Sequence, residues 1–348
     1  MIARHCFTND WITQQRKQFP KADPYLIERQ LAAFELLGLL VESGQKFIFK
    51  GGTALLLLLP VAKRLSIDID IVGDFPSVEL NRLVNFSIFN RMEEDHREEK
   101  GIPKRHFKFF YTSVVNRQET YVLLDVLYTE HGFPNVISVP ITTTLFETDK
   151  QLNVSTPTVN GITGDKLTAF APHTTGVPYG AGKSMEIIKQ LFDIGELFGH
   201  CSSLPEIHTA YGAIWTQEAR FRGNTFTLLQ TLDDTIETAF LVSQAGLKGS
   251  VDSDELREFQ GGIKKLTNYV LGSRYTREVA RLSAARIALL ATLLKSDPGT
   301  AIIDDLKFNP QILDTIRSVT LKGKFQVLNK LKALSPEAFY YWWIVSKS

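Results

Sequence analysis

The chain has 348 residues, of which 44% are hydrophobic and 22% are charged, an ordinary composition for a soluble globular protein with room for two domains. The net charge of +1 favours no class of partner, and two cysteines are too few for a disulfide framework. The first residues lack the apolar core of a signal peptide, and the longest apolar run, 54–62, is too short to span a bilayer. These features predict a cytoplasmic protein with no membrane partner.

Helical and strand patterns alternate through the first half of the chain. Apolar residues at helical spacing predict a helix over 25–43, which Asp23 and Pro24 open. A short strand at 46–50 leads through a tight turn into a buried helix that begins at 54. The patterns that follow predict a strand, a long helix and three further strands, at 67–72, 77–100, 104–114, 120–128 and 135–144.

The second half has helical patterns throughout. Beyond about residue 158 we expect helices at 164–170, 185–198, 225–243, 254–271, 277–295 and 310–319. The aromatic stretch 339–345, FYYWWIV, is expected to pack in the core, with a docking surface for a partner as the alternative. The sequence therefore predicts an α/β domain over 1–160 and a helical domain over 161–348, with a boundary between 145 and 185.

Basic charge gathers in the C-terminal third, where residues 245–348 hold 16 Lys and Arg against 10 Asp and Glu. This modest surplus suits contact with a polyanion such as RNA. Arg274, Arg277 and Arg281 fall on one stripe of an expected helix. The stripe is either a solvated face or a contact with an RNA backbone.

The stretch 176–184, GVPYGAGKS, is close to a phosphate-binding P-loop but has the wrong spacing. Five residues separate Gly176 from Gly182, where the motif requires four before its Gly-Lys pair. The residues before it have the pattern of a helix rather than of a strand. We expect a loop that caps the next helix, from which Lys183 could still reach a phosphate.

Two acids stand two residues apart in the β-branched stretch 64–72, RLSIDIDIV. In a strand, positions i and i+2 point to the same face, so Asp68 and Asp70 would lie side by side, opposite the isoleucines. Two like charges this close repel each other unless a cation lies between them. Either this face is solvated or it holds a metal.

A glycine turn precedes these acids in the stretch 50–55, KGGTAL, where a strand ends and a helix begins at Thr53. Glycines let the backbone approach a ligand closely, and a helix start attracts anions. A phosphate cradle beside paired carboxylates is what a nucleoside triphosphate with Mg²⁺ requires. Asp125 interrupts a later apolar strand; it could share the metal, accept a proton from an attacking hydroxyl, or pair with an arginine as a structural acid.

KGGTAL followed by R-x-S-x-D-x-D resembles the AbiEii/AbiGii toxin family of nucleotidyltransferases, a branch of the polymerase-beta-like superfamily. The resemblance spans roughly 46–200, and the matching residues are Lys50, Gly51, Gly52, Thr53, Arg64, Ser66, Asp68 and Asp70. GDKLTA (164–169) and KQLFDIGEL (189–197) are similar to the later Lys and Asp motifs of the family, which makes Lys166 and Asp193 their main residues. Gln190 departs from the second motif. The resemblance implies an N-terminal polymerase-beta-like domain with a mixed sheet.

The resemblance also implies roles for these residues. Thr53 and the Gly51-Gly52 backbone would hold the triphosphate, and Asp68 and Asp70 would bind Mg²⁺. Lys166 would pair with a phosphate or the leaving pyrophosphate, while Asp193 would bind metal or ligand or orient Lys166. The alternatives are a surface lysine and a helix-packing acid.

Two other residues of the motif each allow two interpretations. Arg64 contacts a phosphate or only supports the strand that carries the two acids. Ser66 lines the site or merely fills the strand. Lys50, beside the turn, is expected to contribute to nucleotide binding.

Members of the family transfer a nucleotide from an NTP to an acceptor, in some cases the 3′ end of tRNA, and act as toxins restrained by an antitoxin. We therefore predict a Mg²⁺-dependent nucleotidyltransferase toxin of phage defence, with an RNA acceptor and a cognate antitoxin protein. The alternatives are the same chemistry on a protein or small-molecule acceptor, and an NTP-binding regulator without catalysis.

Overall fold

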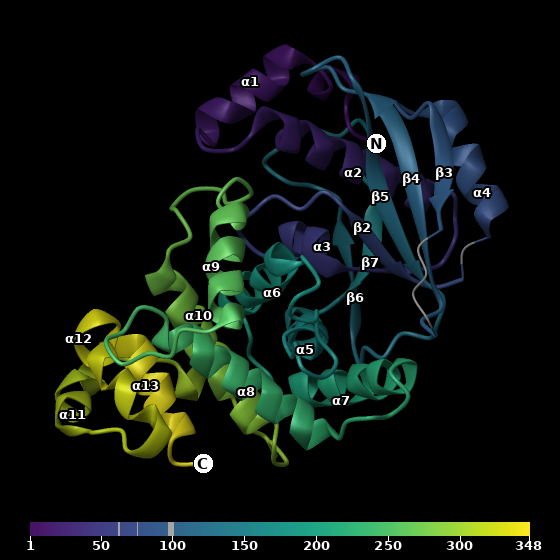
Figure 1. Cartoon of the computed structure of the whole chain (residues 1–348). Helices are drawn as coiled ribbons and strands as arrows, with labels where there is room; N and C mark the ends of the chain where they lie inside the picture. Colours follow the sequence, from purple (N-terminus) through teal and green to yellow (C-terminus); the bar gives the residue numbers. More distant parts are fainter. Residues whose placement is uncertain (62, 75, 97–100) are drawn as a thin grey trace. The chain divides into compact units, whose positions relative to one another are not determined.

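The computed structural model describes residues 1–61, 63–74, 76–96 and 101–348, and its contacts divide the chain into two units (Figure 1). The first consists of Met1–His131, Asn135–Thr158 and Asn268–Arg274, and the second of Gly132–Pro134, Val159–Thr267 and Tyr275–Ser348. The segment Asn268–Arg274 thus belongs to the first unit, although the sequence predicted it within the helical domain.

A five-stranded sheet forms the centre of the first unit. Its strands lie in the order β1 (Ile48–Lys50), β2 (Ile69–Val72), β5 (Glu119–Leu127), β4 (Lys104–Thr112) and β3 (Arg91–Asp95). Strands β2 and β5 run parallel, whereas all other neighbours in this sheet run antiparallel, so the sheet is mixed as predicted. A separate two-stranded sheet pairs β6 (Val136–Pro140) with β7 (Asn153–Pro157), and β7 was not predicted.

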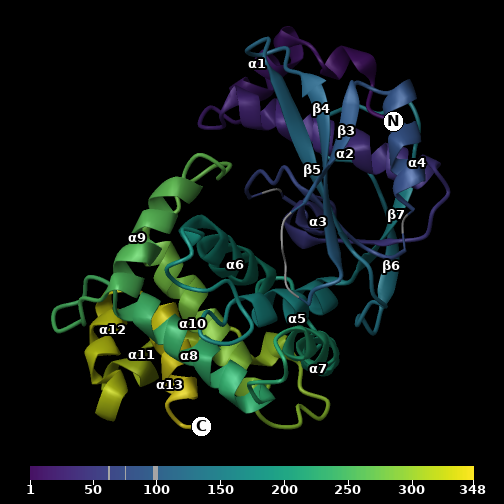
Figure 2. The ribbon, with the colours of Figure 1, turned by 45° about the vertical axis from the view of Figure 1, so that its right-hand side comes forward.

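The two faces of the sheet differ in burial. Along β5, Val122, Leu124 and Val126 are fully buried, while the residues between them are half-buried and point to the other face. Helix α2 (Pro24–Glu42) covers one face of the sheet (Figure 2). This is the face of Val122, where the Tyr25 hydroxyl lies 2.5 Å from the hydroxyl of Thr120. Asp125 therefore lies on the face away from α2.

Short helices complete the first unit. They are α1 (Asn9–Gln18), α3 (Gly51–Leu58) and α4 (Ser77–Arg82). Helix α3 begins directly at the end of β1, as the glycine turn predicted, whereas α1 was not predicted.

The prediction of one helix over 77–100 was wrong. Only α4 and a 3₁₀ turn, Leu83–Phe86, are helical, and the charged stretch that follows is the edge strand β3. Backbone pairing with β4 and cross-strand ion pairs stabilise this strand: Arg105 contacts Glu94 at 2.6 Å and Lys108 contacts Asp95 at 3.0 Å. Charges that suit a solvated helix end suit an edge strand equally well. Residues 97–100 lie outside the described residues.

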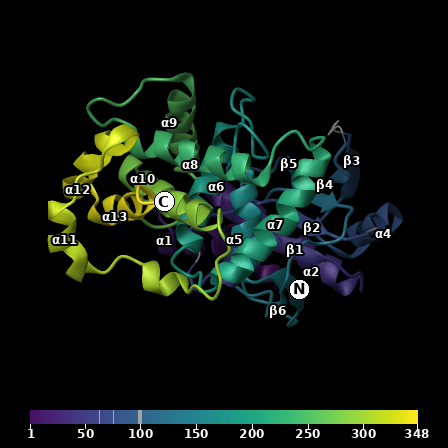
Figure 3. The same cartoon turned by 90° about the horizontal axis from the view of Figure 1, so that it is seen from below.

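Helices build the second unit. They are α5 (Val159–Ala169), α6 (Ser184–Leu197), α7 (Leu204–Phe221), α8 (Leu228–Gln244), α9 (Asp254–Leu266), α10 (Arg277–Leu293), α11 (Leu313–Ser318), α12 (Leu331–Leu334) and α13 (Pro336–Val345). Helix α10 packs against α6, α8 and α13, because its buried alanines allow close approach (Figure 3). Helix α7 was not predicted, and α9 ends earlier than expected, before the chain returns to the first unit.

Aromatic residues of α13 fill the core, as the sequence predicted for FYYWWIV. Trp342 is fully buried, and its indole N–H donates to the Ser243 hydroxyl on α8 at 2.9 Å. The arginine stripe, in contrast, does not form. Arg274 precedes α10 and belongs to the first unit, and Arg281 is buried with its guanidinium donating to the carbonyl oxygen of Ala245.

Across the described ranges, every helix is too short or too polar to cross a membrane.

We expect Gly164→Ala to destabilise the second unit by about 1–3 kcal/mol, because an added methyl would overpack the contact between α5 and α7. A Cβ at this position would lie 2.8 Å from the Tyr211 backbone nitrogen and 2.9 Å from the Ala210 side chain. Gly212, on α7 itself, has nothing within 4 Å of the same atom. Gly212→Ala should therefore raise stability by up to about 1 kcal/mol. Urea unfolding measures both, and equal effects would contradict the close packing.

Candidate active site

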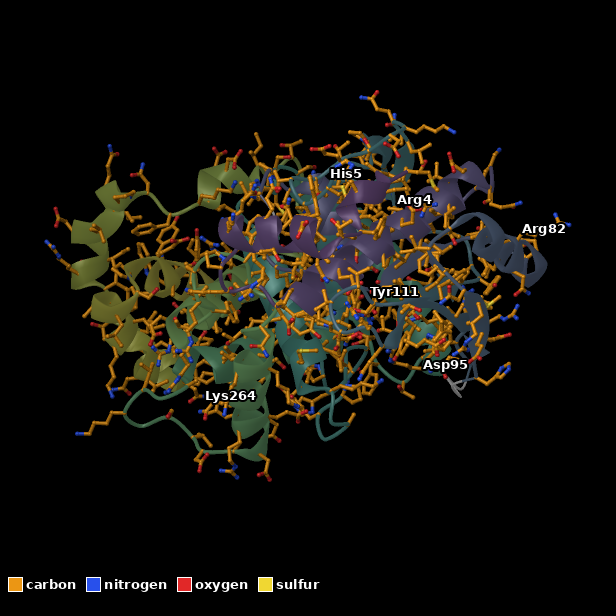
Figure 4. The ribbon with its side chains drawn as sticks, turned by 90° about the horizontal axis from the view of Figure 1, so that it is seen from above. Arg4, His5, Arg82, Asp95, Tyr111 and Lys264 are labelled. Atoms are coloured by element: carbon orange, nitrogen blue, oxygen red, sulfur yellow. The ribbon has the colours of Figure 1, made fainter. Side chains whose placement is uncertain are left out.

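A row of charged and polar side chains crosses the whole sheet on the face away from α2. The strand register pairs Lys50 with Asp70, Asp70 with Asp125, Asp125 with His106 and His106 with Asp95. Directly paired residues of neighbouring strands point to the same face, so the five side chains form one line. Asp95 marks its end on the edge strand β3 (Figure 4). The sheet thus places Asp125 beside Asp70.

Asp70 carries an unfavourable charge. Burial and the neighbouring carboxylates of Asp125 and Asp68 raise the pKa of Asp70 from its ordinary 3.8 to about 6, although Lys104 and Lys50 partly offset them. A carboxylate in this environment is stabilised by any cation that reaches it.

The glycine turn lies directly against Asp70. Gly51 has φ +80°, and a Cβ built on it would lie 2.1 Å from Oδ2 of Asp70. A Cβ on Gly52 would lie 2.5 Å from the Arg64 guanidinium and 2.7 Å from the Ser66 hydroxyl. Gly51 is therefore required by its backbone conformation and by the space beside Asp70, and Gly52 by the space beside Arg64 and Ser66. It brings the first backbone N–H groups of α3 next to the carboxylates.

Asp125 is held by two donors on β4. Nδ1 of His106 lies 2.6 Å from Oδ1 of Asp125, and the Lys104 ammonium lies 2.7 Å from Oδ2. Burial raises the pKa of Asp125, but the hydrogen bond from His106 and the charge of Lys104 outweigh it, so that the pKa is lowered. The partners are a histidine and a lysine rather than the arginine considered as an alternative. Sequence reasoning missed both, although Lys104 and His106 share a face of a predicted strand.

Two hydrogen bonds fix the chain around Asp68. The Thr53 hydroxyl donates to the carbonyl oxygen of Asp68 at 2.5 Å, which ties the start of α3 to the entry of β2. The backbone N–H of Ser66 donates to the side-chain oxygen of the buried Gln30 at 2.8 Å. Asp68 itself is half-buried and directly precedes β2. Thr53 thus positions Asp68 through a hydrogen bond to its backbone carbonyl group.

Arg64 is buried, and a returning segment of the chain supports it. Its guanidinium donates to the Leu65 carbonyl oxygen at 3.0 Å. The Leu65 N–H donates to the Tyr269 carbonyl oxygen at 2.7 Å, and the Leu271 N–H donates to the Lys63 carbonyl oxygen at 2.8 Å. Asn268–Arg274 therefore holds the segment that leads into Ser66 and the two acids.

Lys166 and Asp193 form a buried ion pair inside the second unit. The ammonium of Lys166 lies 2.8 Å from Oδ2 of Asp193, and the two side chains are 5% and 1% exposed. The side-chain oxygen of Gln190 accepts from the same ammonium at 3.4 Å. The alternative of a surface lysine is therefore wrong, and the structure brings the two predicted residues together.

The carboxylates suit a magnesium ion whose remaining ligands come from phosphates. Mg²⁺ is usually held by one or two carboxylates together with substrate oxygens, and Asp68 and Asp70 offer such a pair. The raised pKa of Asp70 reflects the excess negative charge that a cation would relieve. No group of three or more His, Cys, Asp or Glu side chains in the described part of the chain could hold a metal by itself.

A glycine turn at a helix start, beside paired carboxylates on a mixed sheet, is the arrangement of a nucleotidyltransferase. The family model described as "Nucleotidyl transferase AbiEii toxin, Type IV TA system" matches residues 36–268. Because this match covers well over half of the sequence, the chain belongs to that family of toxin–antitoxin nucleotidyltransferases. The family implies an NTP substrate and an antitoxin partner, and the resemblance seen in the sequence is confirmed.

Two solved structures from Helicobacter pylori are similar to this chain at 14% identity. JHP933 has a TM-score of 0.42, with 77% of this chain and 92% of that chain covered. A second protein, whose assignment as a nucleotidyltransferase is provisional, has a TM-score of 0.43, with 81% and 99% covered. No curated protein sequence matches the chain.

We expect Gly51→Ala to abolish nucleotidyl transfer, because its methyl would displace the Asp70 carboxylate. Gly44→Ala is the matched control: Gly44 has a similar φ of +75°, but nothing lies within 4 Å of its added Cβ. Both variants should lose about 1 kcal/mol of stability through backbone strain. Rate assays beside thermal unfolding separate strain from displacement, and equal activity loss in the two variants would contradict the packing argument.

Without divalent cations, Asp70 should make stability depend on pH. Because its folded-state pKa, about 6, exceeds the ordinary 3.8, the folded protein binds this proton more tightly than the unfolded chain. The free energy of unfolding therefore falls as pH rises through this window. Asp70→Asn lacks this loss, so it should gain about 1 kcal/mol or more over wild type at pH 7–8, and the gain should vanish below about pH 3. Unfolding in EDTA across this range measures it; a pH-independent difference would refute the assignment.

Proposed function

We propose that this enzyme transfers a nucleoside monophosphate from an NTP to an RNA acceptor, the 3′ end of a tRNA, in a Mg²⁺-dependent reaction. The observation that carries the proposal is the packing of the Gly51-Gly52 turn against Asp70, with Asp125 in register on the neighbouring strand. In this packing the start of helix α3 lies beside the carboxylate pair, and helix starts attract anions. The two together suit a triphosphate and its metal.

In this proposal each part of the site has one task. The backbone N–H groups at the start of α3 bind the triphosphate, with Lys50 and Arg64 beside them. Asp68 and Asp70 hold Mg²⁺, which supplies positive charge to the phosphate oxygens when bound. Asp125, which His106 and Lys104 hold in place, adds a third carboxylate beside Asp70. Ser66 lines the turn, because its hydroxyl lies in the space that a side chain on Gly52 would occupy.

The transfer forms one bond and breaks another. The acceptor hydroxyl oxygen bonds to the α-phosphorus, the bond from this phosphorus to the leaving pyrophosphate breaks, and the hydroxyl proton passes to a carboxylate oxygen of the row. Catalysis then depends on alignment and charge stabilisation, as in other phosphoryl transfers.

The RNA acceptor rests on the resemblance and on the basic surplus of residues 245–348. A toxin that alters tRNA ends would arrest translation, which suits restraint by an antitoxin and a role in phage defence. A cytoplasmic location is part of the same proposal.

Lys166 and Asp193 remain predicted catalytic residues. The ion pair satisfies both charges within the second unit. Removal of either partner would leave a buried charge, at a cost of about 3–5 kcal/mol. Lys166→Met combined with Asp193→Leu removes both charges, so its rate reports on catalysis with less disturbance of the fold.

The decisive experiment incubates the protein with total bacterial RNA, Mg²⁺ and each α-³²P-labelled NTP in turn. Asp70→Asn and Asp125→Asn serve as inactive variants of nearly unchanged shape. We expect label in a tRNA-sized band with wild type, and a loss of at least about a hundredfold with Asp70→Asn. The labelled nucleotide then gives the base preference.

Other outcomes would redirect the proposal. Label on a protein or small molecule would keep the chemistry and replace the RNA acceptor. Tight NTP binding without label on any acceptor would favour a regulator. Equal labelling by wild type and Asp70→Asn would refute the assigned site.

A further inference from the structure

Lys104 forms an ion pair with Asp125, which it reaches diagonally across the two strands. In the register of β4 and β5, Lys104 pairs with Leu127, whereas His106 is the direct partner of Asp125. The Lys104 side chain nevertheless extends along the strand toward His106, so that its ammonium lies 2.7 Å from Oδ2 of Asp125. Diagonal contacts of this kind suit long side chains.

The charge of Lys104 acts on two carboxylates of the row, those of Asp125 and Asp70. Besides its ion pair with Asp125, it lowers the pKa of Asp70 against the effects of burial and of the neighbouring acids. Asp70 and Asp125 are register partners on parallel strands, so one ammonium serves two like charges.

The Lys104 side chain is 25% exposed, whereas that of His106 is 3% exposed. An ammonium on a flexible four-carbon stem can turn toward water without rearrangement of the sheet. His106, in contrast, is locked in place and keeps Asp125 oriented when the ammonium moves.

We propose that Lys104 is a built-in counter-ion of the Asp70–Asp125 pair and competes with the divalent cation for these carboxylates. This inference rests on the proposed function, in which Asp68 and Asp70 hold Mg²⁺. A lysine charge at this position weakens the binding of a free metal ion, because the two cations repel each other. A triphosphate brings negative charge that offsets the repulsion, so metal entry is coupled to nucleotide binding.

The test measures Mn²⁺ affinity by titration calorimetry, with no nucleotide present. Lys104→Met keeps the length of the side chain and removes its charge, and Lys104→Arg keeps the charge. The matched control is Lys108→Met, because Lys108 lies on the same face of β4, as far beyond His106 as Lys104 precedes it, and pairs with Asp95 at 3.0 Å. Thermal unfolding in EDTA verifies folding, and Lys104→Gln replaces the methionine variant if that variant does not fold.

We expect Lys104→Met to bind Mn²⁺ about tenfold more tightly than wild type, with Lys104→Arg and Lys108→Met close to wild type. Addition of a non-hydrolysable NTP should tighten Mn²⁺ binding by wild type more than by Lys104→Met. Asp70→Asn in each background identifies the site.

Two results would overturn the inference. Asp70-dependent binding that is equal or weaker in Lys104→Met would show that Lys104 supports the site rather than competes for it, and would leave the proposed metal site intact. Absence of Asp70-dependent binding in both wild type and Lys104→Met would overturn the inference and the metal site together.

Discussion

The repulsion between Asp70 and Asp125 is the constraint on which the site depends. A parallel pairing of β2 and β5 places the two carboxylates in register, and burial prevents water from screening them fully. Neighbouring side chains offset part of this repulsion. Lys104 and His106 hold Asp125 in its charged form, whereas Asp70 keeps a raised pKa of about 6. The sheet therefore holds two carboxylates close together at the position where a bound cation would reduce their repulsion and a phosphate chain would supply further ligands to that cation.

The rest of the first unit serves to keep this charged row in place. Helix α2 buries the opposite face of the sheet, and its Gln30 also binds the backbone of Ser66. The returning segment Asn268–Arg274 pairs with the chain around Arg64. Segments far apart in the sequence thus converge on the few residues that precede β2. Such long-range support keeps two like charges at a fixed separation, which a mobile loop would not do.

The sequence allowed much of the fold and site to be predicted, because local patterns carried them. The alternation in IDIDIV predicted strand β2, although the strand begins at Ile69 and Asp68 directly precedes it, and the helical spacing in α2 and α10 predicted those helices. The edge strand β3 was mistaken for a helix because its stability comes from pairing with β4, which a local pattern does not contain. Lys104 and His106 were missed for the same reason: their role exists only once β4 lies beside β5.

The glycine turn shows why some motifs can be read from sequence and others cannot. Gly51 is required twice, by its left-handed φ and by the Asp70 carboxylate that occupies the space of a side chain. A residue under two independent constraints leaves a strong signal at a fixed distance from the acids it contacts. Lys104 faces a single requirement, a positive charge within reach of two carboxylates, which the sequence of β4 does not reveal by itself. The glycines and acids of the site can therefore be recognised from the sequence. The charges that balance the acids can be identified only once the strands are paired in the sheet.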